Sequence, residues 1–346
     1  MRWCATASGS VQLRSGVLDR LRPIVSYDGA FFATVDPTTL LYTSGVRRGM
    51  PTEASPAFIR AELGDRDVNQ LRDLARARSP VGWLDGATGG DRMVSLRYRE
   101  AMRPIGLGDE LRVALRVDGA CWGLLCLHRS AAANGFTQQD VALLATLGPQ
   151  LAEAVRREVV ATKALAEVTV DGPGVAVVAP DGSVESATPA AARWLADLAE
   201  LDVPRTGGVP TVVDAVIRRL VASPAIAADD APLARARVRA PSGRWLVIHA
   251  SHLEGPAPGR VAVVVEPAAA AVLAPLVVAA YALTARETEV LQRLVAGLAR
   301  KAIAADLRIS QHTVNDHVKS IFDKTGVSSV GQLRAHVFAE HFAPGR

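Results

Sequence analysis

The chain has 346 residues, of which 49% are hydrophobic and 21% charged, and its formal net charge is +4. This length is enough for two or three domains with sizeable cores, and the charge excludes a polycationic protein. Its three cysteines do not make a disulfide framework, and residues 1–13 lack the apolar segment of a signal peptide, so we expect a cytoplasmic protein.

The N-terminal region alternates helical and strand-like patterns. Leucine and valine at helical spacing predict a helix over residues 11–22, which Pro23 ends. Strand-like runs follow over residues 29–35 and 40–43, and a longer apolar stripe predicts a helix over residues 56–77. These elements indicate the first half of an α+β domain.

A hairpin is the best-defined feature of this region. Residues 110–117 alternate apolar side chains with arginine and alanine, and Asp118-Gly119 is a strong two-residue turn. The return strand, residues 120–128, is apolar on both faces, so both faces of the sheet must be covered. A long amphipathic helix is predicted from Thr137 to about Arg157, and Gly148-Pro149 should kink or split it.

This order of helix, strands, central helices, hairpin and exit helix resembles a GAF domain, most closely over residues 111–155. The resemblance implies a small molecule held between the sheet and its covering helices. The candidate pocket residues are aromatic and polarisable side chains: Phe32, Trp83, Tyr98, Trp122, Cys126 and His128. Ordinary core residues are the alternative interpretation for the tryptophans, the cysteine and the histidine. Alternation along the strand predicts that Cys121 and Cys126 point to opposite faces, and no metal or cofactor is expected.

Residues 164–267 contain the pattern of a second antiparallel-sheet domain. The predicted strands and helices are, in order, 174–180, 183–185, 187–198, 209–221, 233–239, 244–250 and 260–266. The region resembles a PAS domain, most closely over residues 175–195, and carries no obvious cofactor residue. Arg235, Arg237 and Arg239 form a row on one strand, which we interpret as a charged, exposed strand face rather than a nucleic-acid contact.

An uncharged, alanine-rich run over residues 267–285 leads into the C-terminal segment. It predicts a buried linker helix over residues 268–282, which Pro275 could kink. A membrane span is the weaker alternative, because it would fix the following helices at a bilayer surface.

The segment from Leu283 to Phe338 carries a helix-turn-helix (HTH) pattern. Thr284 and Glu287 form a capping box, and Gly297 offers the left-handed stop of a first helix. A second short helix and a tight turn lead to Ser310, which can cap a third helix with an apolar inner face. Three of the four lysines of the chain lie in this segment, so positive charge concentrates here.

The segment resembles the LuxR-type HTH domain, a four-helix DNA-binding unit. The residues that carry the resemblance are Leu283–Leu291 (LTARETEVL), Gly297, Ala302–Ala304, Leu307, Ile309, Ser310, Thr313, Val314, His317, Val318, Ile321, Lys324, Gly326 and Val327. It implies base contacts by Asn315, Asp316 and Lys319, side-chain types that can pair with adenine, cytosine and guanine respectively.

The remaining positions of the expected DNA site follow from the same comparison. Phosphate contacts or the turn are implied for Lys301, Ser310, Thr313, His317 and Lys324, Gln311 and His312 share the outer face of the third helix, and the last helix is expected to dimerise through Leu333 and Val337. Family members often carry basic residues where Asn315 and Val330 stand. We therefore expect weaker phosphate binding than in the relatives.

No enzyme motif is found: the chain has no Walker loop, HExxH, GxSxG or CxxC. We predict a multi-domain α+β transcriptional regulator that is not an enzyme, binds double-stranded DNA as a homodimer and responds to a small-molecule effector or a partner protein. The expected parts are a GAF-like domain (1–163), a PAS-like domain (164–267), a linker helix (268–282) and an all-α four-helix HTH domain (283–346).

Two other interpretations remain open. In the first, the sensory domains are vestigial and the protein is a ligand-independent adaptor that recruits RNA polymerase or another regulator. In the second, Cys121 or Cys126 senses oxidation, which predicts that a Cys→Ser variant loses the response.

Overall fold

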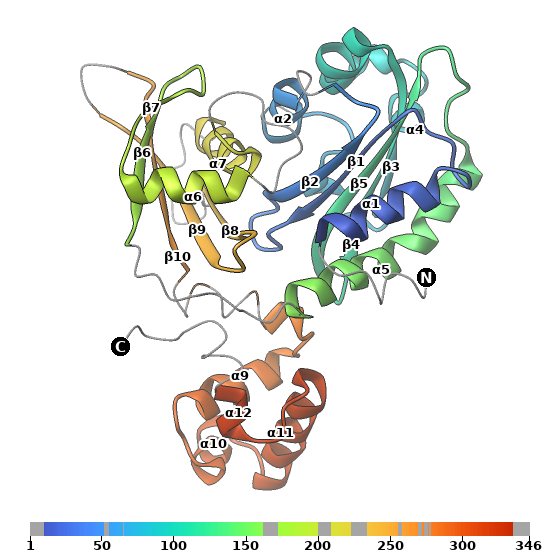
Figure 1. The fold of residues 1–346 in the computed structure, drawn as a ribbon. Coiled ribbons are helices and arrows are strands. Elements are labelled where there is room, and N and C mark those ends of the chain that lie inside the picture. Colours follow the sequence, from blue (N-terminus) through green and yellow to red (C-terminus); the bar gives the residue numbers. More distant parts are fainter. Residues whose placement is uncertain are drawn as a thin grey trace. The chain divides into compact units, whose positions relative to one another are not determined.

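The computed structural model describes residues 10–51, 55–64, 66–161, 172–199, 209–222, 234–254, 258–268, 272, 276 and 278–334. These residues divide into two compact units, one that contains two β-sheets and one that is helical (Figure 1). This arrangement confirms the predicted α+β class.

The first sheet is antiparallel and has five strands in the order β2-β1-β5-β4-β3. The strands are β1 (Gly29–Val35), β2 (Tyr42–Arg48), β3 (Val81–Trp83), β4 (Leu107–Val117) and β5 (Ala120–Ser130). The predicted hairpin joins β4 to β5, with Asp118 and Gly119 at φ values of 50° and 77°. Both values are positive, as a two-residue turn between twisted strands requires.

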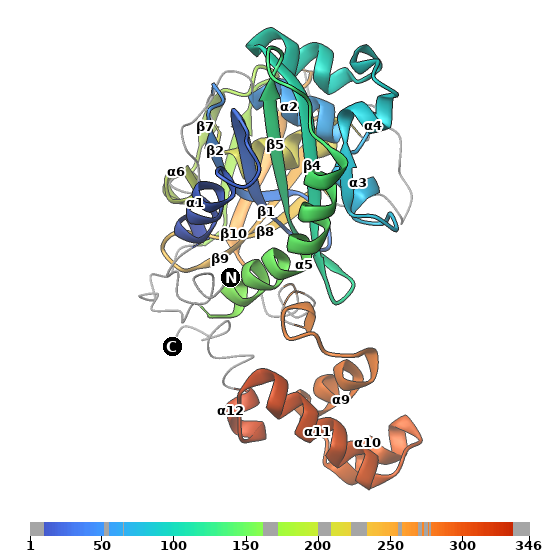
Figure 2. The same ribbon diagram turned by 90° about the vertical axis from the view of Figure 1, so that its right-hand side faces the viewer.

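Helices cover both faces of this sheet (Figures 1 and 2). On one face, α1 (Ser10–Leu21) places Arg14 against the carbonyl of Phe32, and α5 (Gln138–Ala161) approaches Val113 at Gly148. The helical segments on the other side or around the sheet edge are α2 (Ser55–Leu63), α3 (Leu71–Leu74), α4 (Leu84–Thr88), η3 (Arg92–Val94), η4 (Tyr98–Met102) and η5 (Arg103–Ile105). The helix α5 runs through Pro149 as one element, so the predicted split does not occur.

The single helix predicted over residues 56–77 is wrong, because the chain forms α2 and α3 with a turn between them. Asn69 in that turn has a φ of 57°, which a helix cannot accommodate. The carboxylate of Asp67 accepts from the backbone amides of Leu96 and Arg97, and the Gln70 amide donates to the Ala61 carbonyl at 2.8 Å. These tertiary hydrogen bonds outweigh the helical periodicity of the sequence.

A bulge changes the face to which the start of β5 points. The register pairs Leu115 with Gly123 but Arg116 with Cys121, so Trp122 has no partner on β4. Side chains before and after the bulge therefore no longer follow one alternation. Cys121 packs in the same buried cluster as Cys126, and the prediction that they point to opposite faces is wrong.

The second sheet follows the predicted elements closely. Its strands are β6 (Gly174–Val178), β7 (Val184–Ala187), β8 (Arg235–Arg239), β9 (Trp245–His252) and β10 (Val261–Pro267), and its helices are α6 (Pro189–Ala199) and α7 (Thr211–Val221). The strand order β7-β6-β10-β9-β8 repeats that of the first sheet, with every pairing antiparallel. Short turns between β6 and β7 and between β8 and β9 explain why alternation and turn residues located these strands correctly.

The two sheets share one hydrophobic core within the first unit. Leu41, Ile59 and Leu63 of the first sheet region belong to the same buried cluster as α7 and the inner faces of β8 and β9. Helix α7 contacts β2 and α2 as well as β8 and β9. The second sheet region is therefore packed against the first rather than tethered to it.

A buried ion pair lies at the contact between the two sheets. Arg237 of β8 and Asp36, which follows β1, are 3% and 2% exposed. The Arg237 guanidinium donates to both Asp36 carboxylate oxygens at 2.6 and 2.8 Å and to Thr38 Oγ1 at 2.5 Å. We interpreted Arg235, Arg237 and Arg239 as an exposed row, and this is wrong for Arg237. Its charge is neutralised by Asp36 in the interior of the unit.

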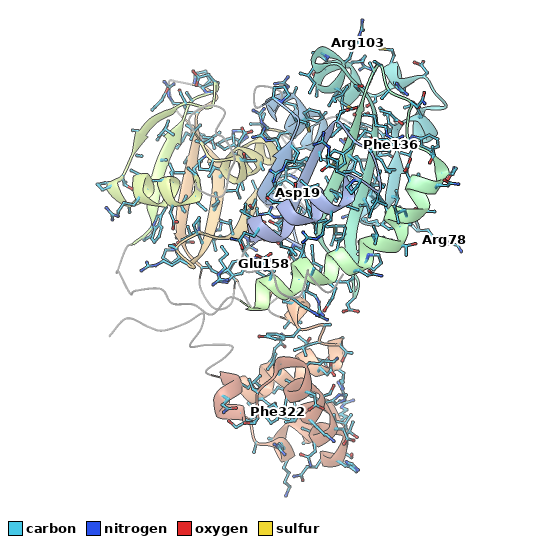
Figure 3. The ribbon with its side chains drawn as sticks, turned by 45° about the vertical axis from the view of Figure 1, so that its right-hand side comes forward. Asp19, Arg78, Arg103, Phe136, Glu158 and Phe322 are labelled. Atoms are coloured by element: carbon cyan, nitrogen blue, oxygen red, sulfur yellow. The ribbon has the colours of Figure 1, made fainter. Side chains whose placement is uncertain are left out.

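The helical unit contains α9 (Ala285–Val295), α10 (Arg300–Leu307), α11 (Gln311–Thr325) and α12 (Val330–Arg334). Their apolar faces meet in one core: Val290, Leu291, Leu294, Ile303, Ala304, Leu307, Val314, Val318, Ile321 and Leu333. Phe322 of α11, labelled in Figure 3, is half-buried against it. Of the predicted linker helix, residues 268, 272, 276 and 278–282 are described, and of these 272, 276 and 278–280 are helical. Within the described chain, no helix is both long and apolar enough to span a bilayer.

Candidate nucleic-acid interface and effector cavity

The turn between α10 and α11 is fixed by two local features. Arg308 ends α10 in the left-handed region, with a φ of 53°. Ser310 then caps α11: its hydroxyl accepts from the Thr313 amide at 3.0 Å and lies 2.8 Å from the Thr313 hydroxyl. The predicted cap is confirmed, and it leaves the first turn of α11 at the surface.

The outer face of α11 is exposed where the sequence predicts base contacts. The exposed predicted residues are Lys301, Ser310, Gln311, His312, Asn315, Asp316, Lys319 and Lys324, while Thr313 and His317 are half-buried. Gln311, Asn315 and Lys319 recur every fourth residue, so they share one stripe of the helix. His312 Nδ1 lies 3.4 Å from Asp316, and both side chains remain more than 60% exposed (86% and 67%).

Arg300 is a residue of this face that the sequence analysis missed. Its guanidinium donates to Asn315 Oδ1 at 2.9 Å and so links α10 to α11. A positive charge therefore lies beside the position where relatives often carry a basic residue. Exposed Arg308 at the turn is a second missed cation. Both arginines could have been identified from their positions in the sequence. Arg300 is adjacent to Lys301, a predicted phosphate contact, and Arg308 lies two residues before the Ser310 cap.

Lys324 lies apart from the other predicted DNA contacts. It is 13 residues after Gln311, or about 20 Å along the helix. Its ammonium lies 2.7 Å from Glu287 of the capping box and 3.1 Å from the Ala282 carbonyl. Burial alone would raise the pKa of Glu287, but hydrogen bonds from Lys324, Ser320 and Thr284 outweigh it and hold that pKa at about 2. The contact of Lys324 is with its own domain.

Leu333 and Val337 are the two residues expected at a dimer contact, and the structure describes only the first. Leu333 is fully buried in the core of its own helical unit. Val337 lies outside the described residues. Of the α12 residues whose exposure the structure describes, Gly331 and Gln332 are exposed. Val330 packs partly buried against the core, which explains an apolar residue at that position.

A cavity of about 60 Å³ lies on the inner face of the first sheet. Its wall consists of Phe31, Tyr42, Gly45, Arg47, Met50, Pro51, Phe58, Ile59, Glu62, Arg97, Glu110, Arg112, Cys126, His128 and Thr211. Strand pairing explains this set. Cys126 of β5 lies opposite Phe31 of β1 on one side and opposite Arg112 of β4 on the other, so these three side chains share one face of the sheet. A cavity of this size has room for about four to six water molecules, and hence for a small ligand.

Two buried arginines pair with buried carboxylates in this wall. Arg97 Nε donates to Glu110 Oε2 at 2.8 Å, and Arg112 Nη2 donates to Glu62 Oε2 at 2.6 Å. Burial alone would raise the pKa of Glu110, but Arg97 and Arg112 outweigh it and lower that pKa. Arg97 Nη1 and Arg112 Nε have no hydrogen-bond partner among the described residues, a state that costs about 1–3 kcal/mol per donor.

His128 completes this cluster as a neutral group. Its ring lies 5.6 Å from the Phe58 ring in an edge-on arrangement, and its Nε2 lies 3.9 Å from Glu110. Burial, helped by Arg97 and Arg112, lowers the pKa of His128 to about 4 against the opposing effect of Glu110. The imidazole therefore carries no charge near neutral pH.

The cavity contains only two of the six predicted pocket residues, Cys126 and His128. Phe32 points to the opposite face of β1, because its neighbour Phe31 pairs with Cys126. Trp122 sits in the bulge, and Trp83 Nε1 donates to Asp109 at 2.8 Å.

Tyr98 packs with Met102 and Leu107 in a neighbouring cluster, to which the cavity residues Met50 and Phe58 also belong. Phe32, Trp83, Tyr98 and Trp122 therefore do not line this cavity, and their assignment to an effector pocket stays a prediction. The charged wall was missed because Glu110 and Arg112 lie on a strand whose alternation resembles that of a half-exposed hairpin, whereas β4 is buried on both faces through Leu115.

The buried thiols do not favour redox sensing. Burial raises the pKa of Cys121 to about 11 and that of Cys126 to about 12. The reactive thiolate is therefore scarce at neutral pH. Within the described residues, no group of three or more His, Cys, Asp or Glu side chains is placed to hold a metal ion.

Comparisons with known families agree with this geometry. Residues 281–337 match the family model described as "Bacterial regulatory proteins, luxR family", and residues 15–155 match the GAF domain model. The predicted resemblances to a LuxR-type HTH domain and to a GAF domain are thereby confirmed. The second sheet region lies between the two matches, and its PAS-like character stays a prediction. No match is found among curated proteins.

Several solved structures are similar to parts of this chain or to most of it. A GAF domain/HD domain protein from Geobacter sulfurreducens has 15% identity and a TM-score of 0.35 over 45% of this chain and 99% of that chain. Escherichia coli SdiA has 14% identity and a TM-score of 0.31 over 98% of this chain and 97% of that chain. At these scores, the similarities carry no argument about function.

Proposed function

We propose that this chain, which carries a GAF domain and a C-terminal luxR-family HTH domain, is a DNA-binding transcriptional regulator with a sensory first unit. The observation that carries the proposal is the exposed stripe of Gln311, Asn315 and Lys319 on a helix whose other face is buried in a four-helix core. Arg300 and Lys301 add positive charge beside this stripe at the start of α10. Such a helix fits the major groove, where these side chains can read base edges.

The proposed complex is a homodimer on two half-sites about one helical turn apart. The dimer contact would use the exposed side of α12, since Leu333 is committed to the core of its own unit. We further propose that α5 and the run after Pro267 transmit the state of the sensory unit by favouring one of two arrangements of the HTH domains. Small-angle scattering that shows one unchanged shape in all conditions that alter DNA affinity would contradict this transmission.

The DNA site is tested by selecting genomic fragments with the full-length protein and measuring binding by fluorescence anisotropy. Asn315→Ala and Lys319→Ala should each weaken binding to the selected site by about 1–3 kcal/mol and relax the preference at particular bases. Gln292→Ala, an exposed change on α9, is the matched control and should leave binding unchanged. Equal binding by all four proteins would place the recognition surface elsewhere.

The adaptor interpretation is separated from the sensory one by ligand binding. Native mass spectrometry of the purified protein and thermal shift against metabolite pools should reveal a small molecule if the first unit is sensory. Unchanged mass and unchanged melting temperature across all pools would favour the adaptor.

A further inference from the structure

The cavity on the first sheet is completed by a helix from the second sheet region. Most of the wall comes from β1, β2, β4, β5 and α2, but Thr211, the first residue of α7, also lines the cavity. Helix α7 contacts β2 and α2, and its buried residues belong to the core that the two sheets share. A ligand in this cavity would therefore touch both sheet regions at once.

The charges around the cavity balance one another. The wall contains three arginines and two glutamates, and Asp67 lies 3.6 Å from Arg97 Nη1 as a third carboxylate. His128 is neutral, as its lowered pKa indicates. A charged ligand would add an uncompensated charge to a buried cluster that is already neutral, which carries a large desolvation cost.

The remaining binding capacity of the wall is aromatic and hydrogen-bond donating. Phe31, Tyr42 and Phe58 supply ring faces and edges. Among the described residues, Arg97 Nη1 and Arg112 Nε are N–H groups without a hydrogen-bond partner, and His128 Nδ1 has none either. Glu62 already accepts from Leu71 and Arg112 through its two oxygens. A ligand oxygen that accepts a hydrogen bond therefore suits this wall better than an ammonium or amidinium group.

On the premise that this cavity is the effector site of the proposed regulator, we propose the chemical class of its ligand. The cavity selects a small, uncharged molecule with a flat apolar body and one carbonyl-type oxygen. Because the cavity has room for only a few water molecules, the ligand has under about ten non-hydrogen atoms. Helix α7 forms part of the binding wall.

Three nearly isosteric probes test this class on the full-length protein: benzamide, benzoate and benzamidinium. They share one ring and differ mainly in charge, so calorimetric titration isolates the charge preference. We expect saturable binding of benzamide and at least about tenfold weaker binding of the two ions. Equal or tighter binding of either ion, or binding of none of the three, would overturn the proposal.

The role of α7 is tested at Thr211. Thr211→Tyr should place a ring in the cavity and abolish benzamide binding, whereas Thr211→Ser should retain it. Val221→Tyr makes a similar change at the exposed far end of the same helix and should bind as the wild type does. Benzamide binding that survives in Thr211→Tyr would place the site elsewhere.

A measurement on the wild type guards against a Thr211 variant that fails to fold. Benzamide should slow amide hydrogen exchange in α2 and α7 together, because both line the cavity. Protection confined to other segments would refute the composite site. DNA selection on the same preparations, without probes, tests the proposed regulator separately from the ligand class. A protein that binds DNA but no probe refutes the ligand class alone. A protein that binds benzamide but no DNA refutes the regulator.

Discussion

His128 is a single residue whose environment makes the first unit sensitive to mild acid. It is 1% exposed on β5, and its pKa is lowered to about 4 from an ordinary 6.5. Between these two values, the unfolded chain binds a proton at His128 that the native protein does not. The stability is therefore fully present above pH 6.5 and declines as the pH falls toward 4, by roughly 3 kcal/mol for this group.

Chemical denaturation of the wild type and of His128→Phe at pH 7.5, 6 and 4.5 measures this contribution. Phenylalanine keeps a ring beside Phe58 but cannot titrate, so the variant should lose less stability over this interval than the wild type does. Other groups titrate in both proteins, and the comparison cancels them. Parallel curves for the two proteins would mean that His128 is protonated, or solvated, in the native state.

The ion pair between Lys324 and Glu287 joins two helices of the helical unit. The pair ties the end of α11 to the start of α9, and Glu287 is only 5% exposed. Lys324→Met should therefore destabilise the helical unit by about 1–3 kcal/mol, because a buried carboxylate loses a charged partner. Hydrogen exchange in α9 and α11 of the full chain should rise accordingly.

The same substitution distinguishes a structural lysine from a phosphate contact. If Lys324 serves Glu287, Lys324→Met leaves the salt dependence of DNA binding unchanged. Lys301→Met, at the exposed start of α10, should instead reduce that slope by about 0.9 without changing stability. A reduced slope in Lys324→Met would return this residue to the DNA interface.

Elements with strong local signals could be predicted from the sequence. The capping box at Thr284, the Ser310 cap and the Asp118-Gly119 hairpin depend on neighbours in the chain, and each forms as expected. The cavity could not be predicted in the same way. Whether Phe31 or Phe32 faces it depends on the register between β1 and β5, which no local pattern determines.

Long-range pairing explains what was missed at the scale of the whole molecule. Arg237 and Asp36 are 201 positions apart, and nothing near either residue indicates a partner. The alternation of arginine and apolar residues on β8 predicts a charged, solvent-exposed face. That prediction would hold for a sheet with no second sheet packed against it. Here the second sheet packs on the first, so the same face becomes an interior and its central arginine needs a carboxylate.

This pair is expected to hold the two sheets together as one unit. Arg237→Met would leave Asp36 buried without its cation, and breaking a buried pair from one side costs about 3–5 kcal/mol. The double variant Arg237→Met with Asp36→Leu removes both charges and should recover much of that loss. Arg235→Met, on the half-exposed start of the same strand, is the control and should change stability by under about 0.5 kcal/mol.

Denaturation followed by hydrogen exchange reports on both sheets separately. In Arg237→Met, exchange should rise in β2, β8 and α7 together, because these three elements contact one another at the shared core. The cycle of single and double variants then gives the coupling between the two charges. If Arg237→Met is no less stable than Arg235→Met, the apolar cluster alone holds the sheets, and a ligand that touches α7 would have to act through packing rather than through this pair.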